Sequence, residues 1–115
     1  MSEIDILLVE DDAVQRRQMV RILKSEGYGV AESSTGQEAI QLLKDREIAL
    51  VLTDKLMPDL DGLSLLKHIR THHPGIPVII MTGLIEEGMD PQPDALLVKP
   101  FTGEDLKRMI RSLLQ

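Results

Sequence analysis

Residues 49–54 read Ala-Leu-Val-Leu-Thr-Asp, an apolar run that ends in a carboxylate. A run this short, without polar alternation, is typical of a strand covered on both faces, as in a parallel sheet. Residues 77–81, Pro-Val-Ile-Ile-Met, form a second run of the same kind. The two runs predict two buried strands, and Asp54 then stands at the carboxyl end of the first.

Working outward, three further apolar runs predict three more strands, over residues 4–9, 28–32 and 95–98. The run at 28–32 alternates weakly and is interpreted as an edge strand. Helical spacing of apolar residues lies between the strands, over residues 13–26, 34–46, 63–72 and from 102 onward. Strands that alternate with helices form right-handed βαβ units. We therefore predict an α/β fold, a doubly wound parallel sheet of five strands with helices on both faces.

Helix boundaries follow from the residues at each end. Gly27 is expected to end the first helix, and residues 34–37 resemble a capping box that opens the second. Residues 102–105 again resemble a helix start. Between the fourth and fifth strands, Gly88, Pro91 and Pro93 leave room for one or two helical turns at most. The helix expected there is therefore short or missing.

Composition narrows the class of protein. The chain has 115 residues with 43% apolar and 28% charged, which suits one domain, residues 1–115, with an ordinary core. A net charge of −6 argues against nucleic acid or an anionic membrane as the main partner. With no Cys, disulfides and thiol catalysis are excluded. No run is long enough to span a bilayer and no signal peptide pattern is present, so we expect a cytoplasmic protein.

Polar residues follow the predicted strands at the edge where ligands bind in open α/β sheets. Glu10, Asp11 and Asp12 follow the first strand and Asp54 follows the third, predicted over residues 49–53. The fourth strand ends in Thr82 and the fifth in Lys99. Carboxylates of this kind suit Mg²⁺, beside which a carboxylate can attack a phosphoryl group while a Lys and a hydroxyl neutralise its oxygens.

Each of these residues also has a structural explanation. Asp12 could cap the first helix, Thr82 could cap a turn, and Lys99 could pair with any acid. Asp54 could likewise cap the loop that precedes Pro58. The argument for a site is that all four strand ends carry such residues together.

These motifs resemble those of the response-regulator receiver domain of two-component signalling. Residues 52–62, Leu-Thr-Asp-Lys-Leu-Met-Pro-Asp-Leu-Asp-Gly, match the D-x-x-M-P-x-x-D-G block of that family. Residues 9–12, 81–83 and 98–101 supply the family's other signatures in the same order. The resemblance covers essentially the whole chain and implies a flavodoxin-like sheet with strand order 2-1-3-4-5.

The resemblance also implies a role for each site residue. Asp54 would be the phospho-acceptor, and Thr82 and Lys99 would contact the phosphoryl oxygens. Asp11, Asp54 and the backbone carbonyl of Leu56 would bind Mg²⁺, which Glu10 would reach through water. The Lys99–Pro100 bond would be cis, as in relatives.

The implied reaction is transfer of a phosphoryl group to Asp54 from a sensor histidine kinase, a phosphotransfer protein or a small donor. Such a chain catalyses its own phosphorylation and dephosphorylation but acts mainly as a switch for an unknown downstream protein. Neither nucleic acid nor membrane binding is expected. A weak dimer through the altered face of the fourth helix stays an open alternative.

Four departures from the family pattern alter these expectations. Leu96 stands where most relatives carry a Tyr or Phe, and the interval from Thr82 to Lys99 is about five residues short. Lys55 replaces a usually apolar residue and either leans into solvent or aids docking of the donor. Leu56 and Leu84 are both apolar, from which we predict a long-lived phospho-state; a half-time of seconds in Mg²⁺ buffer would contradict it.

Two other functions remain open at this stage. One is a receiver-like docking module that binds partners without phosphate; Leu96 and the short fourth helix support it, and the presence of every site residue of the family argues against it. The other is a hydrolase of the haloacid-dehalogenase type, which wants a second Asp where this chain has Leu56. His68, His72 and His73 could suggest a metal, but we interpret them as residues that complement the end of a helix, with no third ligand apparent.

Overall fold

The computed structural model of the chain describes residues 5–84 and 88–114. Five strands form one parallel sheet in the order β2-β1-β3-β4-β5. They are β1 (Asp5–Val9), β2 (Gly29–Ser33), β3 (Leu50–Asp54), β4 (Val78–Thr82) and β5 (Ala95–Val98). The helices are α1 (Ala13–Ser25), α2 (Gly36–Asp45), α3 (Gly62–His72) and α4 (Gly103–Leu114). The predicted doubly wound fold, its strand order and its edge strand β2 are confirmed.

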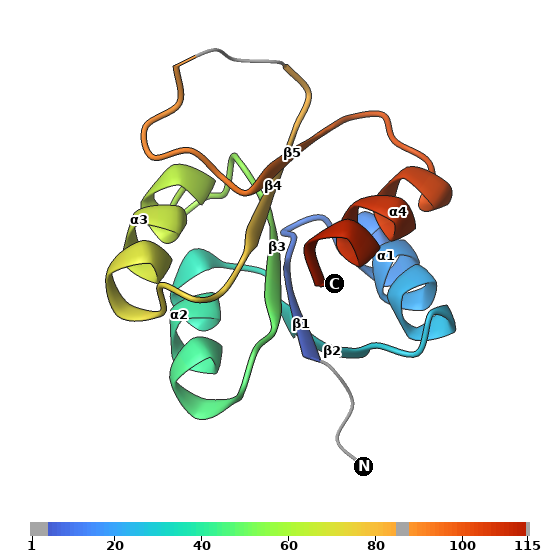
Figure 1. Cartoon of the computed structure of the whole chain (residues 1–115), viewed down its shortest axis with the longest axis horizontal. Coiled ribbons are helices and arrows are strands. Elements are labelled where there is room, and N and C mark those ends of the chain that lie inside the picture. The colour runs from blue at the N-terminus through green and yellow to red at the C-terminus, as the bar shows by residue number, and fades with distance from the viewer. Residues whose placement is uncertain (1–4, 85–87, 115) are drawn as a thin grey trace.

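Helices cover both faces of the sheet and divide the core into two layers (Figure 1). On one face Leu65 and Ile69 of α3 pack with α2 against Leu7 and Val51. On the other, Leu106 of α4 packs with α1 against the alternate residues of the same strands. Because both faces are covered, β1, β3 and β4 are almost wholly apolar, which is why their sequence shows no alternation.

Helix ends lie close to the predicted ones. Glu26 caps the C-terminus of α1, and Gly27 follows with a φ of 89°, a left-handed conformation that favours glycine. The start of α4 is a reciprocal pair, in which Thr102 and Asp105 each accept from the backbone N–H of the other. The capping box of α2 was predicted one residue too early, since Thr35 is the N-cap and accepts from the N–H of Glu38.

No helix lies between β4 and β5 in the described part of that connection, residues 83–84 and 88–94, in line with the prediction for this interval. Met89 is buried in this connection, with 7% of its surface exposed. The Lys99–Pro100 peptide bond is cis, as predicted, and so is Asp90–Pro91, which was not predicted. Within the described residues no helix has the length and apolar character needed to cross a membrane.

Candidate functional site

The carboxyl ends of four strands bring the predicted polar residues to one edge of the sheet. Asp54 is the last residue of β3, Thr82 the last of β4, and Glu10 and Lys99 directly follow β1 and β5. Glu10, Asp54 and Thr82 are all buried, with exposed fractions of 1%, 7% and 8%. Polar side chains this deeply buried need partners. Lys99 pairs with Asp54 and Glu10, whereas the second oxygen of Glu10 and the Thr82 hydroxyl accept from backbone N–H groups.

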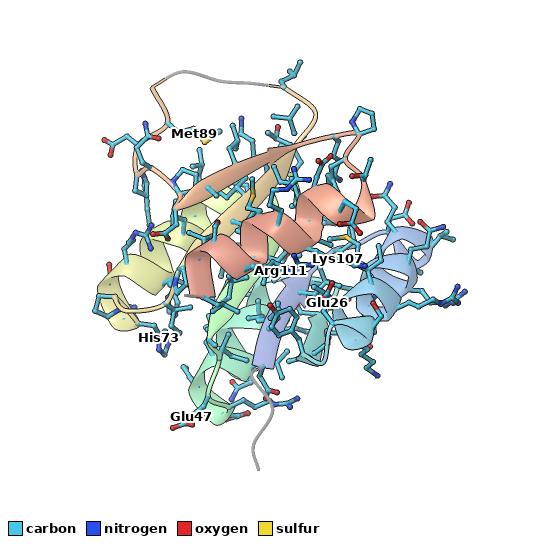
Figure 2. All side chains as sticks on the ribbon, turned by 45° about the vertical axis from the view of Figure 1, so that its right-hand side comes forward. Glu26, Glu47, His73, Met89, Lys107 and Arg111 are labelled. Atoms are coloured by element: carbon cyan, nitrogen blue, oxygen red, sulfur yellow. The ribbon has the colours of Figure 1, made fainter. Side chains whose placement is uncertain are left out.

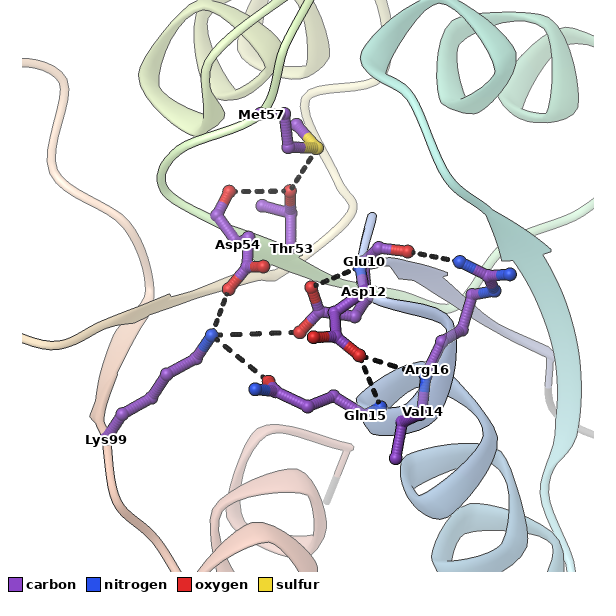
Figure 3. Close-up of polar contacts among 9 residues, drawn as sticks. All are labelled: Glu10, Asp12, Val14, Gln15, Arg16, Thr53, Asp54, Met57 and Lys99. Carbon is purple, nitrogen blue, oxygen red and sulfur yellow. Dashed lines mark hydrogen bonds and ion pairs between the residues drawn. The ribbon is translucent and has the colours of Figure 1, made fainter.

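Lys99 is the cation of this set. Its Nζ lies 2.6 Å from Oδ1 of Asp54 and 3.7 Å from Oε1 of Glu10, and it also donates to Gln15 of α1 at 3.5 Å (Figure 3). Burial alone lowers the pKa of the ammonium group, but the ion pairs with Asp54 and Glu10 outweigh that effect and raise the pKa. Lys99 is therefore held in its charged form against the acceptor carboxylate.

Glu10, Asp11 and Asp54 form a compact acidic cluster. One carboxylate oxygen from each lies within 4.8 Å of the others. Burial and the contact with Asp54 together raise the pKa of Glu10 to about 8, because they outweigh the opposite effects of the Asp12 N–H and of Lys99. A single ammonium group thus does not neutralise the cluster, which is the condition under which a hard cation would be bound.

The loop after β1 is fixed from two directions. Asp12 caps α1 by accepting from the N–H groups of Val14 and Gln15, as predicted, and its own N–H donates to Oε2 of Glu10. Arg16 donates to the backbone carbonyl of Glu10 at 2.7 Å and pairs with Glu32 on β2. These contacts, drawn in part in Figure 3, hold the Glu10 carboxylate toward Asp54.

The loop after β3 is fixed at both ends. Gly62 donates to the carbonyl of Lys55 at 2.7 Å, and a Cβ built on Gly62 would lie 2.5 Å from the carbonyl oxygen of Asp54. Asp59 accepts from the N–H groups of Gly36 and Gln37 at the start of α2, which lowers its pKa. The segment that carries the carbonyl of Leu56 is therefore tied to both neighbouring helices.

A pocket of about 160 Å³ opens at the acceptor. Asp54, Leu56, Thr82 and Lys99 line it together with Lys55, Met81 and Gly83. The Thr82 hydroxyl accepts from the N–H of Leu84 at 3.2 Å, so the turn-capping interpretation of Thr82 also holds in this structure. The pocket gives a small group access to Asp54 between Thr82 and Lys99.

The structure places Lys55, Leu96, Leu56 and Leu84 but does not test the effects predicted for them. Lys55 lines the acceptor pocket and is partly buried, which fits either interpretation of its charge. Leu96 is partly buried against the α2–α3 layer of the core. Leu56 and Leu84 have 78% and 70% of their surface exposed, and their effect on hydrolysis stays a prediction.

Sequence reasoning missed three residues that support the site, two of which act through the backbone. Arg16, Asp59 and Gln15 were not singled out, although each contacts the site or a loop that carries it. Arg16 and Asp59 bond to main-chain atoms, which carry no residue-specific pattern. Gly62 offered a signal as the last residue of the block after Asp54, and its close contact with the Asp54 carbonyl explains why a glycine stands there.

A sequence profile of the response regulator receiver domain matches residues 6–111. The chain belongs to that family. It is 34% identical over 114 residues to the response regulator receiver protein CpdR of Brucella abortus, covering 95% of each chain. It is also 38% identical to the response regulator MprA of Mycobacterium leprae, covering 96% of this chain and 50% of that protein.

Solved structures give the same result for this receiver domain. A CheY-like receiver domain protein of Methanospirillum hungatei superposes with a TM-score of 0.92 at 30% identity, covering 98% of this chain and 94% of that one. The chemotaxis response regulator CheY4 of Vibrio cholerae, at 24% identity and a TM-score of 0.91, shares the fold.

The receiver domain spans very different shares of its relatives. It covers nearly all of CpdR and half of MprA, but only 12% of the sensor kinase CckA of Brucella abortus, to which it is 34% identical. Similar domains therefore occur both as almost an entire protein and as one part of a much longer one.

Proposed function

We propose that residues 1–115 act as one phospho-accepting unit, in which Asp54 receives a phosphoryl group and Mg²⁺ is the cofactor. The observation that carries this proposal is the position of Asp54. Its buried carboxylate meets the Lys99 ammonium at 2.6 Å on one side and Glu10 and Asp11 within 4.8 Å on the other. A nucleophile, a cation and a metal-binding pair are thus assembled around one pocket.

The residues present fit a Mg²⁺ ion. Oε1 of Glu10 is buried and, among the described residues, has no hydrogen-bond partner. Asp11 is exposed and turned to the same cluster, so it can supply a ligand from the solvent side. Asp11, Asp54 and the carbonyl of Leu56 would hold the ion, with Glu10 reached through water. When bound, Mg²⁺ supplies positive charge that offsets the negative oxygens of a phosphoryl group.

The proposed transfer uses the Asp54 carboxylate as the nucleophile. One of its oxygens forms a bond to phosphorus while the P–N bond to the donor imidazole breaks, and the electron pair of that bond returns to the imidazole nitrogen. Hydrolysis reverses the modification, because water attacks phosphorus and the bond to Asp54 breaks to give inorganic phosphate and the free carboxylate. Both steps resemble transfers in which positioning and charge do most of the catalysis.

Lys99 and Thr82 would report the modification. An acyl phosphate adds up to about two negative charges at the end of β3. Lys99 can then move from Oδ1 of Asp54 to a phosphoryl oxygen. The Thr82 hydroxyl, which accepts from the N–H of Leu84, can donate its own proton to a second phosphoryl oxygen. Thr82 ends β4 and Lys99 follows β5, and no helix is described between these two strands. We therefore propose that the surface formed by β4, β5 and the connection between them changes on phosphorylation.

A protein donor is favoured by the surface around the pocket. The exposed large apolar side chains of the described residues are Val14, Leu56 and Leu84, and each follows the carboxyl end of a site strand. Exposed apolar side chains beside the site strands offer surface that a protein partner can bury when it docks at the pocket. We therefore propose a sensor histidine kinase or a phosphotransfer protein as the donor, acting on this chain in the cytoplasm.

The test is incubation with acetyl phosphate or beryllofluoride, with and without Mg²⁺, followed by intact mass spectrometry or fluorine NMR. We expect a Mg²⁺-dependent gain of one group that is lost in Asp54→Asn. Asp12→Asn is the matched control, since Asn caps a helix as well as Asp and Asp12 lies outside the acidic cluster. Modification of Asp54→Asn to the same extent would contradict the assignment of the acceptor.

The second candidate is a docking module that binds partners without phosphate. It is favoured by Leu96 in place of an aromatic residue and by the absence of a helix in the described part of the β4–β5 connection. No modification by any donor, with the protein folded and Mg²⁺ present, would support this candidate over the first.

A further inference from the structure

Three imidazoles gather at the C-terminal end of α3. The rings of His68 and His72 are stacked, with centroids 4.3 Å apart and planes inclined by 24°. His73, the C-cap of α3, places its ring 6.2 Å from that of His68 at a tilt of 49° (Figure 2 labels His73). Because α3 begins at the acceptor loop and runs back along the sheet (Figure 1), its C-terminal end lies toward the edge where the strands begin, and His73 lines a pocket there with Asp5 and Ala49, away from Asp54.

One hydrogen bond fixes the state of the His72 ring. Nδ1 of His72 lies 3.1 Å from the backbone carbonyl oxygen of His68. A carbonyl oxygen only accepts, so Nδ1 carries the proton, and in the neutral ring Nε2 keeps a free lone pair. A backbone carbonyl bound to one ring nitrogen is the arrangement that typically orients a metal-binding imidazole.

The charges around His68 favour its neutral, metal-binding form. Burial lowers the pKa of His68, and the positive charges of His72, His73 and Lys44 of α2 lower it further. Lys44 also opposes a bound cation, whereas the C-terminal end of α3 attracts one. The site is therefore suited to an ion that gains from direct imidazole bonds rather than from charge alone.

We propose that His68 and His72 form a two-imidazole site for a borderline divalent transition ion such as Zn²⁺, Ni²⁺ or Cu²⁺. Tetrahedral Zn²⁺ with bonds of about 2.0–2.1 Å needs ligand nitrogens about 3.3 Å apart. The ring centroids lie 4.3 Å apart, which brings the two side chains within reach of one ion, and the rings must turn out of their stacked arrangement to direct both Nε2 lone pairs at it; His72 is exposed and has room to do so. The site differs in ligand chemistry from the carboxylate cluster at the other end of the sheet, which suits Mg²⁺.

His73 is not part of the chelate in this arrangement. Its ring is farther from His68 and strongly tilted, and groups of three metal-binding side chains within 4.8 Å include only the acidic cluster among the described residues. His73 therefore provides a matched control, an imidazole of the same kind at the same helix end.

The experiment is a Zn²⁺ titration by calorimetry in an Asp11→Asn background, which weakens the carboxylate cluster as a competing site. We expect one ion per chain, and a loss of affinity of about tenfold or more in His68→Asn and in His72→Asn. His73→Asn should keep the affinity within about threefold. Nitrogen NMR of the imidazoles should show the Nε2 resonances of His68 and His72 shifting with Zn²⁺ and not with the same concentration of Mg²⁺.

Two results would overturn the proposal. One is unchanged Zn²⁺ affinity in the His68→Asn and His72→Asn variants, which would place the ion elsewhere. The other is a loss in His73→Asn as large as in those variants, which would replace the two-imidazole site by one of three ligands. The NMR measurement on the unaltered histidines decides the matter even if a variant folds poorly.

Discussion

Glu10 is the residue whose burial has the clearest measurable consequence. Its pKa rises from 4.5 to about 8, first because it is buried and then because it contacts Asp54. Between these two values the folded state binds more protons at this position than the unfolded chain does. This contribution to stability is therefore fully present below pH 4.5 and is lost as the pH rises through about 8.

We expect Tm measured in EDTA to fall from about pH 7 to about pH 9, and Glu10→Gln to flatten this decline. This pH range avoids the titration of His68. The lowered pKa of His68 makes stability rise with pH, and it does so only below about pH 7. Glu38→Gln is the control, because the pKa of Glu38 is lowered and that residue is ionised in both states throughout the window. An equal slope in the wild type and Glu10→Gln would show that Glu10 does not titrate in this range.

Gly62 is required by the close approach of two backbones. A Cβ at this position would lie 2.5 Å from the carbonyl oxygen of Asp54 and 2.9 Å from Cα of Lys55. Alanine would gain at most about 1 kcal/mol as a better helix former at the start of α3. The clash with backbone atoms outweighs that gain, so we expect Gly62→Ala to lower the free energy of unfolding by about 2–3 kcal/mol.

Urea unfolding followed by circular dichroism checks this value. The matched variant is Gly75→Ala, where a Cβ would meet nothing within 4 Å. That substitution should change the free energy of unfolding by about 1 kcal/mol or less, in either direction. Similar losses in both variants would mean that glycine flexibility, rather than the contact with Asp54, governs the effect.

At the scale of elements, the sequence predicted strands better than helix starts. The strands were within one residue of their final bounds wherever the chain is described, because continuous apolar runs are required where both faces are covered. The start of α2 was displaced because Ser34 and Thr35 are both good caps. Only the structure shows that Glu38 pairs with Ser34 and selects Thr35 as the N-cap.

The connection between β4 and β5 contains a buried side chain although no helix lies in its described residues, 83–84 and 88–94. Met89 keeps only 7% of its surface exposed, while Leu84, earlier in the same connection, exposes 70%. We expect Met89→Ala to lower the free energy of unfolding by about 2 kcal/mol, the low end for a buried methionine. Leu84→Ala should change it by about 0.5 kcal/mol or less.

Chemical denaturation of both variants tests this contrast. If Met89→Ala lowered the free energy of unfolding as little as Leu84→Ala, the Met89 side chain would contribute nothing to the stability of the fold, which would contradict this prediction. A large effect confined to Met89 would mean that this side chain anchors the connection against the rest of the fold.

At the scale of the whole molecule, the site was predictable because parallel strands end at one edge. Asp54, Thr82 and Lys99 are 28 and 17 residues apart along the chain, yet the topology alone brings them together. The contacts that hold the loops were not predictable in this way. Arg16 reaches a carbonyl and Asp59 reaches two N–H groups, and such bonds depend on loop paths that residue patterns do not encode.

The last prediction concerns the coupling of the acidic cluster to the stability of the entire fold. The chain carries a net charge of −6, and three of its carboxylates, Glu10, Asp11 and Asp54, converge within 4.8 Å. An ion that binds this cluster only in the folded state stabilises the fold by about 1.4 kcal/mol for each tenfold increase above its Kd. We therefore expect Tm to rise steadily with Mg²⁺ concentration, and Asp11→Asn to remove most of the rise.

Two controls separate the cluster from the overall charge of the molecule. Asp45→Asn, which removes an exposed acid on α2, should leave the rise in Tm intact, and NaCl at matched ionic strength should not reproduce it. Because general screening would act on all the acids alike, an equal response in both variants would show that the stabilisation comes from net charge and not from the cluster beside Asp54.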